Sequence, residues 1–213
     1  MSTDALLTLA QWMSPAFPVG AFAYSHGLER VIDRGDLQDA AALSLWLEDI
    51  LNHGSGQSDV VLLAAAFHAK PEEVDFIDAT ARAFCASSER LTETLDQGAA
   101  FGRTVDDIWG TDIGTQSYPV AVGRAASAKG LPLEITAEFY LHAMMANLVS
   151  AAVRLVPLGQ TEGQAVLAGL APQIKQIAEV SVTLGLDALS SSCFATDIAA
   201  MHHETQYSKV FRT

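Results

Sequence analysis

The feature that most constrains the fold is the spacing of apolar residues, which recur every three or four positions along most of the chain. The clearest run lies between Glu134 and Leu155. Its repeating positions are Ile135, Phe139, His142, Met145, Leu148 (or Val149), Ala152 and Leu155. This period places side chains on one face of an α-helix. Alternating β-branched runs, which indicate strands, are almost absent. The sequence therefore predicts an all-α protein with a central helix at 134–155.

Capping and breaking residues divide the remaining chain into further helices. Residues 13–23 contain two prolines and a glycine and separate the first two helices. We expect Asp36 to cap the third helix, since its short carboxylate accepts from free backbone amides. Near the C-terminus, Pro172 is expected to begin a new helix, so that 161–170 and 172–189 form two separate elements.

No linker and no internal repeat divides the sequence. We therefore predict a single-domain helical bundle of about ten helices over residues 1–213. Residues 202–213 differ from the rest, because they are polar and lack a periodic apolar run, although Tyr207 and Phe211 occur there. Such a segment is typical of a flexible C-terminal tail that a partner orders.

The composition favours a protein that meets other proteins. Half of the residues are hydrophobic and only 17% are charged, so surplus apolar surface is expected at an interface. The net charge is −13, and residues 1–107 hold 17 of the 25 acidic residues. A chain this acidic repels phosphate backbones, so we expect no nucleic-acid partner.

The sequence gives no sign of export or membrane insertion. The N-terminus lacks a basic region followed by an apolar run, and the central apolar helix is interrupted by His142, Asn147 and Arg154. The two cysteines, Cys85 and Cys193, are far apart, which suits a reducing compartment. We therefore expect a cytoplasmic protein with no membrane partner.

Catalytic motifs are missing from the sequence. It contains no Gly-rich phosphate loop, no HExxH and no GxSxG. The adjacent Asp106 and Asp107 make one acidic pair, which is too little for a metal cluster and is expected to cap or solvate a loop. We predict that the chain is not an enzyme.

None of the six histidines is spaced to share a metal with another on one helix face. His202 and His203 are weak metal candidates, because neighbouring residues on a helix point in different directions. His142 is expected in the core with a hydrogen-bond partner. We expect no tight metal or cofactor site in this chain.

Residues 14–29 (SPAFPVGAFAYSHGLE) stand out because a loop with two prolines and Gly20 also carries several large apolar rings. Two interpretations remain open. The loop packs onto the bundle, or it is a preformed docking loop in which Tyr24 and Glu29 make polar contacts.

The chain resembles the UreF family of urease accessory proteins. Three stretches carry the resemblance: 14–29, 147–163 (NLVSAAVRLVPLGQTEG) and 197–213 (DIAAMHHETQYSKVFRT). Residues 88–98 and 118–132 also look like segments of this family. The resemblance covers nearly the whole chain in the same order.

The resemblance implies an all-α, cytoplasmic homodimer without enzyme activity of its own. UreF-like proteins bind the accessory protein UreD (also called UreH), and that complex recruits the GTPase UreG. The assembly delivers nickel to apo-urease, so the resemblance implies that the complex handles nickel and that this chain holds no cofactor.

The same resemblance implies residues that contact a partner or brace the tail. They are Pro18, Gly20, Phe22, Tyr24, Glu29, Tyr207, Lys209, Phe211 and Arg212. Two positions depart from the family pattern: His26 stands where Gln is common, and Lys209 stands where Arg is expected. Lysine lacks the planar fork of arginine, so we do not expect bidentate anchoring at Lys209. Arg154 is expected to be structural and to have a carboxylate or carbonyl partner.

An alternative from a different class is a helical small-ligand binder or enzyme with a pocket between helices. It requires polar groups that converge from facing helices, and the sequence offers only His142 and Asn147 for this. A nickel carrier requires a thiolate or several imidazoles at fixed spacing, which the chain does not offer.

Overall fold

The computed structural model describes residues 2–212, and all of its regular secondary structure is helical. The predicted all-α bundle of about ten helices is confirmed. The helices are α1 (Thr3–Trp12), α2 (Leu28–Asp33), α3 (Ala40–His53), α4 (Ser55–His68), α5 (Val74–Ala83), α6 (Ser88–Trp109), α7 (Tyr118–Ala128), α8 (Leu133–Leu155), α9 (Gln160–Ser181) and α10 (Phe194–His203). Three short 3-10 helices join them: η1 (Ala21–Ala23), η2 (Pro71–Glu73) and η3 (Leu186–Ala188).

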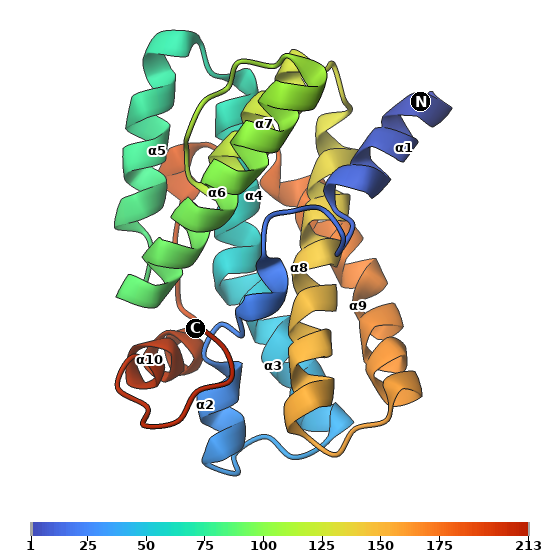
Figure 1. Cartoon of the computed structure of the whole chain (residues 1–213), viewed down its shortest axis with the longest axis vertical. Coiled ribbons are helices and arrows are strands. Elements are labelled where there is room, and N and C mark those ends of the chain that lie inside the picture. Colours follow the sequence, from blue (N-terminus) through green and yellow to red (C-terminus); the bar gives the residue numbers. More distant parts are fainter. Residues whose placement is uncertain (1, 213) are drawn as a thin grey trace.

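Helix α4 lies at the centre of the bundle (Figure 1). It packs against α3, α7, α8 and α9, and its residues 58–64 are buried. Helix α8 packs along α9, and α6 packs along α7. Helix α10 lies across one end of the bundle, where it contacts α2 and α6 (Figure 1). The long helices therefore pack into one bundle, and the C-terminal helix α10 is added at one end.

Serine and aspartate side chains cap several helices. Ser2 accepts from the amide of Ala5, and Ser87 accepts from that of Arg90. The expected cap at Asp36 is wrong. The cap of α3 is Asp39, whose Oδ1 lies 2.8 Å from the amide nitrogen of Ala42. Both are aspartates near the same helix start, and only the backbone geometry distinguishes them.

The expected break at Pro172 is wrong, because α9 continues through it to Ser181. Proline removes one backbone hydrogen bond and typically costs a helix about 3 kcal/mol. The helix continues because its apolar side chains are buried on both sides of Pro172, including Leu167, Leu170, Ile174 and Ile177. Tertiary packing therefore outweighs the local signal.

The expected inner face of α8 is shifted by about one residue. Tyr140, Leu141 and Met145 are buried, whereas His142 is exposed. The prediction of a core histidine at His142 is therefore wrong. Because α8 packs against α9 and α4 as well as α2 and α3, its buried surface is broad, and the spacing alone does not fix its centre.

The C-terminal tail does not extend away from the molecule. Phe211 is only 5% exposed, and the amide of Arg212 donates to the carbonyl of Ala23 across 2.7 Å. The predicted flexibility of residues 202–213 is therefore not confirmed in the part that the structure describes, because apolar burial and backbone hydrogen bonds hold the tail to the body.

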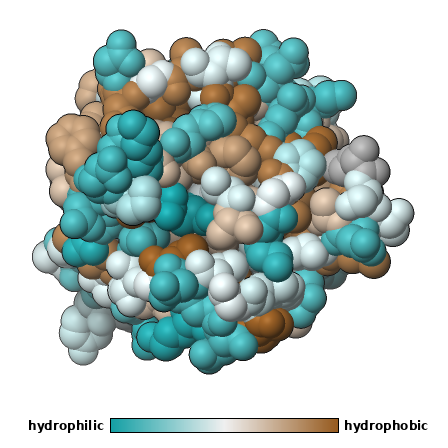
Figure 2. All heavy atoms as spheres, turned by 90° about the horizontal axis from the view of Figure 1, so that it is seen from above, coloured by the Kyte–Doolittle hydropathy of each residue, from teal (hydrophilic) through white to brown (hydrophobic). Residues whose placement is uncertain are grey.

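Within residues 2–212, no helix is both long enough and apolar enough to cross a bilayer. Figure 2 shows the end of the molecule seen from above, where hydrophilic and hydrophobic residues are interspersed over the surface. Single exposed apolar residues of this kind are ordinary on folded proteins.

Candidate partner-binding site

The loop between α1 and α2 is anchored by one aromatic ring and exposes another. Phe17 is 7% exposed, and its ring centroid lies 5.6 Å from that of Phe101. Pro18 lies at the surface, and Phe22 is 64% exposed. Gly20 has a φ of +73°, which a residue with a side chain rarely adopts, and this turn leads into η1. The loop therefore presents Phe22 on a fixed backbone.

Tyr24 is buried and does not offer its ring to a partner. It is 4% exposed, and its hydroxyl donates to Oδ2 of Asp96 across 3.3 Å. Burial raises the pKa of Tyr24, and the carboxylate of Asp96 adds to this, although Arg212 opposes it. Arg212 Nη1 lies 3.8 Å from the same carboxylate oxygen. Tyr24 and Arg212 therefore meet at Asp96, and the loop and the tail are joined there.

Glu29, in the first turn of α2, binds the backbone of the tail. Its two carboxylate oxygens accept from the backbone amides of Val210 and Phe211 at 2.7 and 2.8 Å. The carboxylate is buried and also lies 3.2 Å from Nε2 of His203. Hydrogen bonds from amides to a buried carboxylate are among the stronger ones in proteins. Glu29 therefore braces the tail.

A second carboxylate, from α6, completes this brace. Glu89 Oε2 lies 2.7 Å from Nδ1 of His203, and Oε1 accepts from Nζ of Lys209 across 2.7 Å. Lys209 also donates to the backbone carbonyl of Glu204. The lysine at this position thus anchors the tail with a single ammonium group and two acceptors.

Helix α10 approaches α2 backbone to backbone. Gly27 has a φ of +75°, and a Cβ atom there would lie 2.6 Å from the backbone nitrogen of Ala200. Only glycine fits both the conformation and the contact. This close approach brings His203, which is fully buried, within reach of Glu29.

Phe211 and Arg154 join the tail to α8. The guanidinium carbon of Arg154 lies 5.9 Å from the centroid of the Phe211 ring. Such a contact is favourable by about 0.5–1 kcal/mol at an exposed site. Arg154 was expected to have a carboxylate or carbonyl partner, and the recorded contact is with an aromatic ring instead.

A group of buried charges lies beneath the loop. His26 Nε2 is 2.8 Å from Oε1 of Glu93 and 2.9 Å from Nη1 of Arg90. Burial alone would raise the pKa of Glu93, but Arg90 and His26 outweigh it and lower the pKa to about 2. Asp59 accepts from the Tyr140 hydroxyl across 2.7 Å, and burial raises its pKa. Cavities of about 40 and 60 Å³ border this group, which is room for a few water molecules.

The two adjacent histidines of α10 lie in different environments. His202 is exposed, whereas both ring nitrogens of buried His203 face carboxylates. In residues 2–212 no group of three or more His, Cys, Asp and Glu side chains is arranged to hold a metal ion.

Asp106 caps the loop after α6 by accepting from the amides of Ile113 and Gly114, as predicted.

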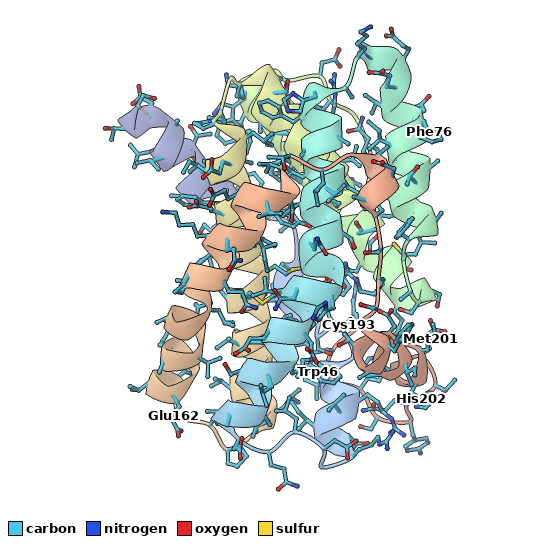
Figure 3. All side chains as sticks on the ribbon, turned by 180° about the vertical axis from the view of Figure 1, so that it is seen from behind. Trp46, Phe76, Glu162, Cys193, Met201 and His202 are labelled. Carbon is cyan, nitrogen blue, oxygen red and sulfur yellow. The ribbon has the colours of Figure 1, made fainter. Side chains whose placement is uncertain are left out.

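An exposed apolar stripe on α10 was missed by the sequence analysis. Phe194, Ile198 and Met201 are 68%, 51% and 48% exposed, and their spacing of four and three places them on one helix face. Ile198 borders a groove of about 470 Å³ whose other wall includes Leu45 and Trp46 of α3. Figure 3 shows Trp46, Met201 and His202 at the same end of the molecule. The spacing was visible in the sequence, but periodicity does not reveal which helix faces stay uncovered.

The predicted site residues thus fall into two groups. The tail brace contains Tyr24, Glu29, Lys209, Phe211 and Arg212. The exposed group contains Pro18, Phe22 and Tyr207, while Gly20 shapes the turn between them. These features define an all-α protein with exposed apolar surfaces.

Comparison with known proteins identifies the family. A family model described as UreF matches residues 37–171. The urease accessory protein UreF of Roseobacter denitrificans is 70% identical over 213 residues, which are all of this chain and 96% of that protein. The protein of the same name from Ruegeria pomeroyi is 53% identical over 209 residues, which are 98% of this chain and 96% of that protein. The one from Jannaschia sp. is 42% identical over 211 residues, which are 99% of this chain and 96% of that protein.

The chain therefore belongs to the UreF family of urease accessory proteins. Its relatives are accessory proteins by name, and the family is not an enzyme family. The resemblance found in the sequence is confirmed over the full length.

Proposed function

We propose that this chain is a scaffold for urease maturation. In this proposal it binds UreD (also called UreH), recruits the GTPase UreG, and acts as a chaperone in nickel insertion into apo-urease. It works in the cytoplasm as a homodimer. The names of its relatives support the urease connection, and the exposed α10 stripe next to a docked tail is the observation that carries the scaffold function.

Two exposed surfaces differ in character and suit different partners. The α10 stripe (Phe194, Ile198 and Met201) is wholly apolar, which is typical of the permanent interfaces between identical subunits. The tail surface contains exposed Tyr207 and exposed, charged Arg212, and aromatic and arginine residues are enriched at interfaces between different proteins. We assign the stripe to the homodimer and the tail surface, with Phe22 of the neighbouring loop, to UreD.

Co-purification with UreD and UreG tests this function, with the mass of each complex measured by light scattering. Ile198→Asp is expected to convert the dimer into a monomer, and Tyr207→Ala is expected to weaken UreD capture while the dimer remains. Phe76→Ala is the matched control, because Phe76 is 69% exposed on α5, away from both surfaces. If the wild-type chain captures neither protein, the scaffold proposal is wrong.

A further inference from the structure

A hollow of about 500 Å³ lies on the surface where the end of α4, η2, the start of α5 and η3 come together. Its apolar lining consists of Ala65, Ala69, Phe76, Ile77 and Leu186. Figure 3 shows Phe76 toward the opposite end of the molecule from Met201 and His202 of α10. The hollow is therefore separate from the α10 stripe and from the tail surface.

The ring of Phe76 is exposed at the side of this hollow. The inner face of α5 is formed by buried Val74, Ile77 and Ala81, whereas Phe76 is 69% exposed. A single exposed apolar residue is ordinary, but this ring adjoins further apolar side chains in the lining. An aromatic ring beside a concave apolar surface is typical of interfaces between proteins.

Hydrogen bonds fix the backbone around the hollow. Pro71 begins η2, and the amide of Lys70 donates to Oε2 of Glu73 across 2.8 Å. Nη1 of Arg124 donates to the carbonyl of Ala69, the residue that ends α4, across 3.0 Å. The surface is thus formed before a partner arrives, and a preformed surface lowers the entropic cost of binding.

Carboxylates surround the apolar lining. Glu72 and Glu73 line the hollow, and Asp75 and Asp187 are each adjacent in sequence to a lining residue. All four are exposed, and none of them forms a salt bridge within residues 2–212. In the same part of the chain no Lys or Arg lines the hollow. A positively charged side chain of a partner would therefore meet carboxylates that this chain does not neutralise.

Shape and charge select the occupant. The lining residues His68, Glu72, Glu73 and Phe76 are exposed, so the hollow is open to solvent and does not enclose a small molecule. Nucleic acids and anionic membranes are negatively charged, and a second copy of this chain carries a net charge of −13, so each of them is repelled. A protein segment with apolar and basic side chains on one face complements both parts of the surface.

We propose that this hollow docks a basic, amphipathic segment of another protein. An apolar side chain of that segment packs against Phe76, and a lysine or arginine pairs with Glu72. Oε2 of Glu73 already accepts from the amide of Lys70, so the second oxygen of Glu73 is the one that faces the partner. This contact surface is additional to the α10 stripe and the tail surface.

The test titrates the full ¹⁵N-labelled chain with a synthetic helical peptide of about 14 residues, whose leucines share one face and are flanked by lysines. The amide signals of residues 65–77 and 186 are expected to shift. Affinity is expected to fall between about 0.05 and 0.5 M NaCl, because salt screens exposed charges. Two control peptides replace every lysine by glutamate or every leucine by serine, and each is expected to bind at least about tenfold more weakly.

Phe76→Ala is expected to weaken binding about fivefold or more, and Glu72→Gln about threefold. Leu7→Ala and Glu179→Gln are the matched controls, because Leu7 is 63% exposed on α1 and Glu179 is exposed on α9. Both controls are expected to keep the wild-type affinity. Amide signals outside residues 65–77 that match those of the wild type show that each variant is folded.

The proposal is overturned if either control peptide binds as tightly as the basic one, or if Leu7→Ala and Glu179→Gln weaken binding as much as the test variants do. It is also overturned if light scattering detects self-association that Phe76→Ala abolishes, since the occupant is then a second copy. Phe76→Ala is expected to leave UreD capture intact, so this proposal and the scaffold function fail separately.

Discussion

The guanidinium of Arg154 lies over the ring of Phe211, 5.9 Å from its centroid, and so joins the end of α8 to the end of the tail. Phe211 is also held by the carboxylate of Glu29, which accepts from its backbone amide. The tail is therefore fixed at one residue by an apolar ring, a cation and a backbone hydrogen bond. This arrangement predicts that Phe211 dominates tail docking.

Phe211→Ala should release the tail, with a loss of up to about 3 kcal/mol from the buried ring. Arg154→Ala should cost about 0.5–1 kcal/mol, since its contact is exposed. Hydrogen exchange at the amides of residues 210–212 measures both effects. Val210→Ala is the control, because the Val210 side chain is 75% exposed. Equal loss of protection in the Phe211 and Val210 variants would contradict this assignment.

Gly27→Ala should displace α10, because the new Cβ atom would lie 2.6 Å from the backbone of Ala200. Gly20→Ala is a matched control: its φ of +73° is nearly the same as the +75° of Gly27, but a Cβ atom there meets nothing within 4 Å. Both variants pay about 1–2 kcal/mol for the left-handed backbone. Thermal unfolding should therefore show a larger loss for Gly27→Ala, and similar losses would show that α10 moves without cost.

The ionised form of Glu93 should stabilise the fold in a pH-dependent way. Its pKa is lowered from 4.5 to about 2, because the opposing effect of burial is outweighed by Arg90 and His26. A carboxyl group with a lowered pKa stabilises the native state above its unfolded pKa, and this stabilisation is lost as the pH falls. The window therefore runs from about pH 4.5 down to about pH 2.

Glu93→Gln should reduce stability near pH 7 by several kcal/mol, because buried Arg90 loses its carboxylate partner. It should also flatten the pH dependence between about 4.5 and 2, measured by urea unfolding at each pH. Glu72→Gln on the exposed 3-10 helix η2 is expected to keep the wild-type profile. If the dependence of stability on pH is unchanged in Glu93→Gln, other groups cause the loss of stability at low pH.

The helices were largely predictable because apolar spacing and caps are local signals. Ser2 and Ser87 cap α1 and α6, and serine is a residue type that favours this position. The tail brace was less predictable, since Glu29 and Phe211 are 182 positions apart. The sequence placed both residues in the same candidate site through the family resemblance, but periodicity and charge alone do not pair them.

The exposed faces were the hardest part to predict. His142 follows the apolar period of α8 but lies at the surface. Ile198 follows the apolar period of α10 and is likewise exposed. Periodicity shows which residues share a helix face. Whether that face is covered depends on how distant helices pack, and this information is not local.

Pro172 shows the same limit and leads to a prediction about stability. The helix α9 runs through it without the hydrogen bond that a backbone amide at this position would donate. Pro172→Ala restores that donor and removes the clash of the ring with the preceding turn, although the unfolded chain gains freedom worth about 0.4–1 kcal/mol. We expect a net gain of about 1–2 kcal/mol, which corresponds to roughly 2–8 °C in Tm for a chain of this size.

Pro71→Ala is the matched control for this prediction. Pro71 begins η2, where a backbone amide has no helical acceptor, so alanine gains no hydrogen bond and the substitution should be neutral or destabilising. Calorimetry of both variants separates the two positions. If Pro172→Ala lowers Tm as Pro71→Ala does, the packing of α9 against α3 and α8 requires the proline, and Pro172 stabilises the bundle instead of ending a helix.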